Sequence, residues 1–120
     1  EATRYLNNAH REIKQADKNG DVYRDVKHLR VACGTAYLAV LKALDGIFLL
    51  RNIQKPQKRP SIEYYQNNLS QMDKKILNYL NITYGILHLY GYYDGFNDVK
   101  TIQSGFEKAE YIINKLKSAI

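Results

Sequence analysis

The longest apolar run of the chain is VACGTAYLAVLKALDGIFLL, residues 31–50, and this run decides the fold. Two apolar series interleave within it, each stepping by three or four residues, which is the spacing of a helix face. Apolar residues therefore cover most of the circumference of the predicted helix, which is typical of a helix surrounded by others. We expect this central helix to extend from Val22 to Arg51, with Asp21 as its N-cap.

The same run resembles a membrane span in length. A span needs about 20 nearly uncharged residues, whereas Lys42 and Asp45 lie inside this run and Gly34 and Gly46 interrupt it. The sequence therefore favours a helix in a protein core. No signal-peptide pattern is found either, so a cytoplasmic protein is the expectation.

Asp45 is the unusual residue of the run, because its helical neighbours are mostly apolar. A buried carboxylate without a partner is costly, so we expect Asp45 to pair with Lys42 or with a tyrosine hydroxyl. The alternative is a polar residue that faces a small pocket. A glycine inside a helix costs roughly 1 kcal/mol relative to alanine, so Gly34 and Gly46 predict that another helix approaches closely there.

Length and composition indicate one folded unit. The 120 residues suffice for a single core, so we expect one helical-bundle domain over residues 1–120. Eleven tyrosines and no tryptophan are unusual, and a tyrosine can line a core edge while its hydroxyl reaches water or a polar partner. The single cysteine excludes an internal disulfide, and no Cys/His cluster indicates zinc, so neither a metal nor a cofactor is expected.

The net charge of +6 is unevenly placed: residues 1–60 hold 12 Lys and Arg against 6 Asp and Glu, whereas residues 61–120 hold 6 and 6. This basic half permits RNA or an acidic protein as partner, and solubility charge is the alternative interpretation. The strongest basic cluster, in and beside the proline-bracketed loop 52–60, contains no acid and no aromatic residue. It is either a solvated loop or a contact for phosphate or an acidic partner, made by Arg51, Lys55, Lys58 and Arg59.

The rest of the chain predicts helices only. A first helix is expected over residues 2–18, stopped by Asn19-Gly20, and a short one from Ile62 to about Leu69, capped by Ser61. A fourth begins at Ser70 or Asp73 and ends near Tyr90, and Asp98 caps the last. We find no strand-like alternation. The predicted fold is an all-α, up-and-down bundle of four long helices and one short helix.

The last helix has a narrow apolar seam. Its members step by three and four residues, which suits either a bundle neighbour or a second subunit, so a homodimer is favoured. The members are Val99, Ile102, Phe106, Ala109, Ile113, Leu116 and Ile120.

Three histidines are the main candidates for chemistry. His10 and His28 lie among charged residues and are expected to be exposed. His88 lies on an apolar, aromatic helix end, where it is either a hydrogen-bonded core residue or a general acid–base group. Asp94 in the next turn and Asp45 are weaker catalytic candidates. A small-molecule pocket lined by Tyr84, His88, Tyr92 and Asp45 is a further possibility.

Three segments of the sequence resemble HEPN domains, which are small bacterial helical bundles and often dimeric. They are ACGTAYLAVLKALDGIFLLRNI at 32–53, KPQKRPSIEYYQNNL at 55–69 and ILHLYGYYDG at 86–95. The whole chain also resembles a bacterial family of small uncharacterised helical proteins. The resemblance implies a HEPN-like bundle that self-associates.

The resemblance also bears on catalysis, because catalytic HEPN members are metal-independent ribonucleases. Their motif is an arginine, four to six intervening residues and a histidine. His88 matches the histidine, but Asn81, Ile82 and Thr83 occupy the positions where the arginine would stand. The resemblance therefore implies a non-catalytic binding or scaffold module rather than an enzyme. A degenerate ribonuclease or RNA-binding module that uses His88 is the alternative.

Overall fold

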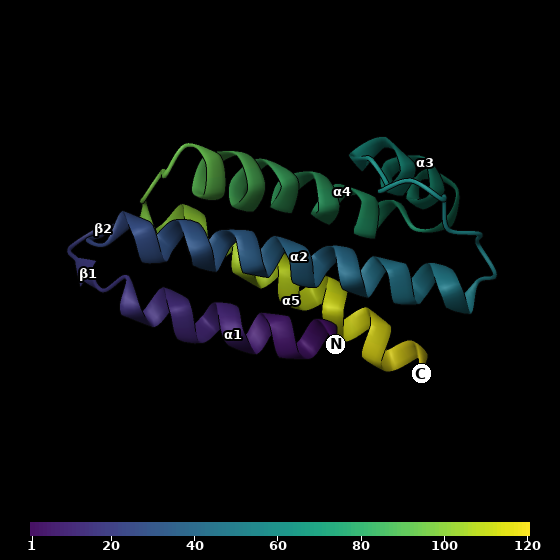
Figure 1. Cartoon of the computed structure of the whole chain (residues 1–120), viewed down its shortest axis with the longest axis horizontal. Helices are drawn as coiled ribbons and strands as arrows, with labels where there is room; N and C mark the ends of the chain where they lie inside the picture. The colour runs from purple at the N-terminus through teal and green to yellow at the C-terminus, as the bar shows by residue number, and fades with distance from the viewer.

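The apolar run forms most of α2 (Val26–Leu50), the helix around which the others are arranged. In the computed structural model, which describes all 120 residues, α2 packs against α1, α5 and η1 (Figure 1). The complete set of elements is α1 (Ala2–Gln15), β1 (Lys18–Asn19), β2 (Val22–Tyr23), α2, α3 (Ile62–Met72), α4 (Lys74–Thr83), the π-helix η1 (Tyr84–Tyr93) and α5 (Val99–Ala119). The molecule is elongated, at 45 × 25 × 24 Å.

The prediction that α2 is surrounded by other helices is confirmed for one broad face only, because Val31 and Leu38 on the opposite face are 46% and 41% exposed. The buried residues lie on this one face and recur every three or four positions: Leu29, Ala32, Cys33, Ala36, Tyr37, Ala39, Val40, Ala43, Leu44, Ile47 and Phe48. They join one core cluster of 27 buried side chains. The predicted all-α fold class is confirmed to this extent: the chain is a compact, almost entirely helical bundle.

α2 is also long and apolar enough to cross a membrane, judged by length and composition alone. Of its most apolar 18-residue stretch, 44% is buried inside the protein. The core helix of a folded protein passes the same test, so the observation is weak evidence for a membrane span.

The N-terminal end of α2 differs from the prediction. The helix does not begin at Val22, and Asp21 is not its N-cap; Asp25 takes that place, and its side chain accepts a hydrogen bond from the backbone N–H of His28 at 3.2 Å. Residues 18–23 instead form the short hairpin of β1 and β2. Gly20, with φ of 66°, occupies the first loop position, where two-residue hairpins favour glycine.

The hairpin is held by a segment far away in the sequence. Tyr23 donates its backbone N–H to the carbonyl of Asn97 at 2.9 Å, and Val99 donates to the carbonyl of Asp21 at 2.8 Å. These bonds fix the start of α5 beside the start of α2. The prediction that Asn19-Gly20 ends α1 was wrong, because α1 already ends at Gln15 and both residues belong to the hairpin.

Two of the later helices begin at the aspartate N-caps that the sequence predicts. Asp73 accepts hydrogen bonds from the backbone N–H groups of Lys75 and Ile76, both at 3.0 Å, and Asp98 accepts one from Thr101 at 3.0 Å. Both aspartates are therefore N-caps, as predicted. Ser61 precedes α3 without a side-chain bond. The helix that begins as α4 continues as a π-helix beyond the predicted end at Tyr90.

The apolar seam of α5 is used inside the bundle, and Leu116 lies at its half-buried edge. The buried members are Val99, Ile102, Phe106, Ala109 and Ile113. The last member, Ile120, is 89% exposed. Of the two interpretations of the seam, the structure therefore supports the bundle neighbour.

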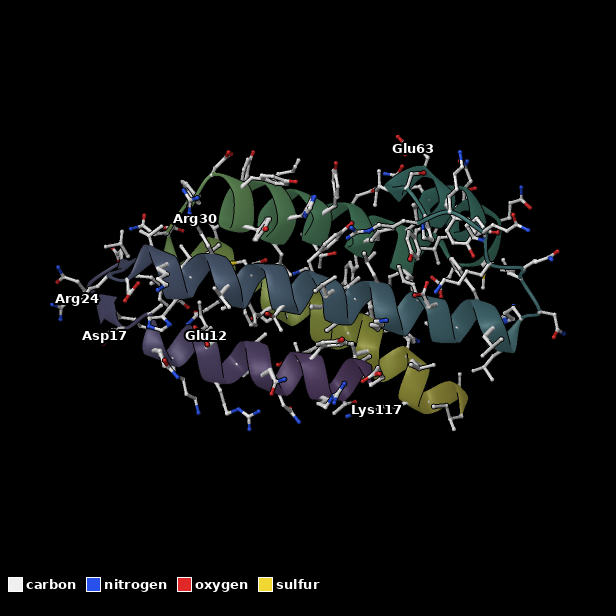
Figure 2. All side chains as sticks on the ribbon, in the orientation of Figure 1. Glu12, Asp17, Arg24, Arg30, Glu63 and Lys117 are labelled. Atoms are coloured by element: carbon white, nitrogen blue, oxygen red, sulfur yellow. The ribbon has the colours of Figure 1, made fainter.

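The two histidines expected to be exposed are half-buried and paired with carboxylates. His10 bonds Glu110 of α5 through Nε2 at 2.8 Å. His28 of α2 bonds Glu12, whose side chain lies between α1 and α2 (Figure 2). These pairs tie α1 to α5 and to α2.

Candidate functional site

A groove between α2 and η1 contains His88 and has a volume of about 430 Å³. Three separate parts of the chain line it: α2, the loop 52–60 and η1. The lining residues are Val31, Gly34, Thr35, Tyr37, Leu38, Leu41, Arg59, His88, Tyr92 and Tyr93. Most are apolar or aromatic, and Arg59 and His88 are the only ones that carry charge at any pH near neutrality.

Four tyrosines surround the imidazole of His88. The ring centroids lie 4.8 Å away for Tyr37, 5.0 Å for Tyr93, 5.3 Å for Tyr84 and 6.2 Å for Tyr92. The rings of Tyr37 and Tyr92 are stacked with the imidazole, whereas that of Tyr93 meets it edge to face. The site is therefore an aromatic cluster around one titratable group.

The electrostatics of the groove favour the neutral imidazole. Burial, and secondly the Arg59 guanidinium, lower the pKa of His88 below the usual 6.5. No carboxylate lines the groove, and Arg59 has no ion-pair partner within 4.0 Å. At neutral pH His88 can accept a proton or a hydrogen bond, and Arg59 supplies an unpaired positive charge.

The π-helical form of η1 explains why three of its side chains reach this groove. A π-helix bonds each residue to the fifth one along the chain instead of the fourth. This brings both Tyr92 and Tyr93, four and five residues after His88, to the same side as the imidazole. Gly34 of α2 provides the space for Tyr92, because a Cβ at Gly34 would lie 2.8 Å from the ring.

Asp45 lies at a different hollow, of about 380 Å³, at the far end of α2. Tyr65 donates its hydroxyl hydrogen to Asp45 Oδ1 at 2.9 Å, and Lys55 Nζ lies 3.8 Å from Oδ2. The expected pairing with a tyrosine hydroxyl is confirmed, and the lysine that approaches is Lys55 rather than Lys42. Asp45 therefore does not share a pocket with His88.

The other predicted residues are spread over the surface. Tyr84 contacts the imidazole but does not line the groove, and Asp94 is an exposed C-cap of η1 outside it. Arg51 ends α2, and Lys58 is exposed without an ion pair. Of the four basic residues of the loop region, only Arg59 joins His88.

Sequence reasoning missed Tyr37, Tyr93 and Arg59 as parts of the groove. In the sequence, Tyr37 looks like a core residue of the apolar series of α2. Its contact with His88 depends on the packing of η1 against α2, which the sequence does not show. Tyr93 reaches the imidazole through the π-helical turn. Arg59 lies 29 positions before His88, a separation at which spacing gives no signal of contact.

The fold and the groove define an all-helical bundle with an aromatic, basic surface site and no group of three or more His, Cys, Asp or Glu residues that could hold a metal ion. Sequence comparison then gives the family. Residues 1–118 match a domain of unknown function, DUF5618, so the chain belongs to the DUF5618 family. No curated protein matches the chain in sequence.

Solved structures agree with this assignment. A protein of unknown function from Dyadobacter fermentans is 40% identical, superposes with a TM-score of 0.90, and the match covers 100% of this chain and 94% of that one. A protein from Sulfolobus solfataricus superposes with a TM-score of 0.79 at 15% identity, over 98% of this chain and 94% of that one. The second likeness concerns the fold alone.

Proposed function

We propose that this protein is a HEPN-like binding module that self-associates through the face containing the His88 groove. The observation that carries the proposal is the exposure of large apolar side chains along both walls of the groove. Val31 is 46% exposed, Leu38 41%, Tyr92 45% and Tyr93 60%. A contiguous apolar patch on a small protein typically marks an interaction surface.

A second copy of the chain is the occupant that this surface suits. Val31 and Leu38 are seven residues apart, so they form one ridge on α2, and the consecutive Tyr92 and Tyr93 of η1 line the same groove. A two-fold interface presents the same patch from both subunits, so the two tyrosines can meet the aliphatic ridge twice. Tyrosines near the centre of such a patch contribute much of the binding energy.

Light scattering coupled to size-exclusion chromatography tests the association. We expect a dimer, and we expect Leu38→Glu to raise its dissociation constant more than about tenfold by placing a charge in the apolar patch. Leu49→Glu is the matched control, because Leu49 is also an exposed leucine of α2, at 75%, but lies outside the groove. A strict monomer at high protein concentration, or equal effects of the two substitutions, contradicts the proposal.

A ribonuclease or RNA-binding activity is the second candidate, and one observation favours it. The arginine missing at positions 81–83 has a counterpart in Arg59, which reaches the His88 groove from the loop 52–60. In such a site neutral His88 would take the proton of a ribose 2′-hydroxyl, whose oxygen would bond to the phosphorus while the bond from phosphorus to the 5′-oxygen breaks. The guanidinium would stabilise the charge that develops on the phosphate, and the leaving 5′-oxygen would take a proton from water.

This candidate predicts RNA cleavage that depends on both groups. His88→Ala should reduce the rate at which mixed RNA is degraded by about 10²-fold or more, and Arg59→Gln should also reduce it, whereas Lys58→Gln should not. The neutral imidazole is the active form, and the pKa of His88 lies below the usual 6.5. The rate should therefore fall as the pH drops through that lowered pKa, because the imidazole then becomes protonated. Absence of cleavage, or cleavage that survives His88→Ala, eliminates a ribonuclease.

A further inference from the structure

A cluster of two tyrosines and three lysines lies where α4 meets α5, away from the His88 groove. The rings of Tyr79 and Tyr111 meet edge to face with centroids 4.7 Å apart. Three ammonium groups surround these rings, from Lys75, Lys108 and Lys115. We call these five residues the lysine–tyrosine cluster.

The rings hold the ammonium groups in place. Lys75 Nζ lies 4.7 Å from the ring centroid of Tyr111 and 5.7 Å from that of Tyr79. Lys108 lies 5.6 Å from Tyr79, and Lys115 lies 5.3 Å from Tyr111. Cations within about 6 Å of a ring face are attracted by its quadrupole. The three positive charges are therefore positioned before any partner arrives.

No carboxylate neutralises the cluster, since none of its lysines has an ion-pair partner within 4.0 Å. The nearby acids are engaged elsewhere. Asp73 bonds the N-terminal backbone of α4, and Glu110 bonds His10 on the side of α5 that faces α1. Glu107 lines the same hollow as His10. Glu107 and Glu110 therefore line a different hollow of the protein from the three lysines of the cluster.

We propose that the lysine–tyrosine cluster is a docking surface for an acidic segment of a partner protein. Ammonium groups attract carboxylates, and the tyrosine hydroxyls offer further hydrogen-bond donors. Lys108 and Lys115, seven residues apart on α5, are separated by about 10 Å along the helix axis. An extended segment spans that distance in about three residues, so carboxylates at that interval can reach both lysines.

Two other polyanions fit the cluster less well. A nucleic-acid strand gains affinity by stacking bases on free aromatic faces, but two ammonium groups already approach each of the tyrosine rings. An anionic membrane surface is bound by helices that also insert apolar side chains. No exposed large apolar residue lies within α4 or α5, and the nearest, Ile120, stands alone just past the end of α5.

Fluorescence anisotropy of a labelled short polyglutamate peptide tests the proposal, with polyglutamine and oligouridylate of equal length as comparison ligands. We expect polyglutamate to bind the full chain and the combined variant Lys75→Gln, Lys108→Gln, Lys115→Gln to bind it more than about tenfold more weakly. The matched control replaces Lys14, Lys18 and Lys27, three exposed lysines outside the cluster, by glutamine and so has the same net charge. It should lose at most about twofold, because surface charges farther apart than about 10 Å are largely screened.

The tyrosines give a second, independent measurement. Tyr111→Phe keeps the ring and should leave polyglutamate affinity within about twofold, whereas Tyr111→Leu removes the cation–π attraction and should weaken binding by about threefold or more. Equal losses in the cluster and control variants overturn the proposal, as does the absence of polyglutamate binding. Tighter, cluster-dependent binding of oligouridylate would instead assign the surface to nucleic acid.

Discussion

Phe48→Ala should lower the free energy of unfolding by about 3–5 kcal/mol. Phe48 is 1% exposed, and its ring lies 5.7 Å from that of Tyr64 and 5.9 Å from that of Tyr65. It therefore makes the aromatic contact between α2 and the helix α3, beside the hydrogen bond from Tyr65 to Asp45. Alanine would leave a cavity that α3 cannot fill without moving its aromatic residues.

Chemical denaturation followed by far-UV circular dichroism measures this loss, and the neighbouring residue supplies the control. Leu49 is 75% exposed, so Leu49→Ala should change the free energy of unfolding by less than about 0.5 kcal/mol. If the two alanine variants were equally stable, the packing of Phe48 against Tyr64 and Tyr65 would not stabilise the fold.

Gly91→Ala should destabilise the protein by about 1–3 kcal/mol, because it inserts a methyl group into a filled space. A Cβ at Gly91 would lie 2.7 Å from the Cβ of Cys33 and closer still to its sulfur. Cys33 is fully buried on α2, and burial raises the pKa of its thiol to about 12, so it acts as a small packing group. This contact sets the distance between η1 and α2, and with it the width of the groove.

Gly85→Ala is the matched control for Gly91→Ala, since both glycines belong to η1. No atom lies within 4 Å of a Cβ built at Gly85. Alanine is favoured over glycine inside a helix, so this variant should be more stable than wild type by about 0.5–1 kcal/mol. Thermal melting of the two variants should therefore shift in opposite directions. Melting shifts in the same direction would show that the Cys33 contact does not limit how closely η1 approaches α2.

Local signals in the sequence predicted the helices and several of their ends. The burial of Val40 and Leu44 follows from the spacing of apolar residues by three and four along one face of α2. Asp73 and Asp98 cap helices because each precedes an apolar helical series. The hairpin was missed because a glycine is typical both of a helix end and of a two-residue turn, and the turn here is Gly20-Asp21. Only the bonds to Asn97 and Val99, which no local pattern reveals, distinguish the two.

The candidate site was predicted in part. His88 and Tyr92 share a groove because residues four apart on a helix lie on one side, which the sequence shows directly. Tyr93 joins them only because η1 is a π-helix. The apolar residues of this region follow ordinary α-helical spacing, so the sequence did not indicate a π-helix. Asp45 was grouped with His88 because both interrupt apolar segments, yet the length of α2 keeps them in separate hollows.

Arg59 supplies the one permanent charge of the groove from a loop, whereas every other lining residue stands on a helix. The permanent charge of the groove and the helices of the fold are consequently encoded in different parts of the chain. Relatives that exchange residues 54–59 can acquire or lose affinity for anions while their helices melt at the same temperature. Divergence of ligand preference within this family should therefore be sought first in its most irregular connection.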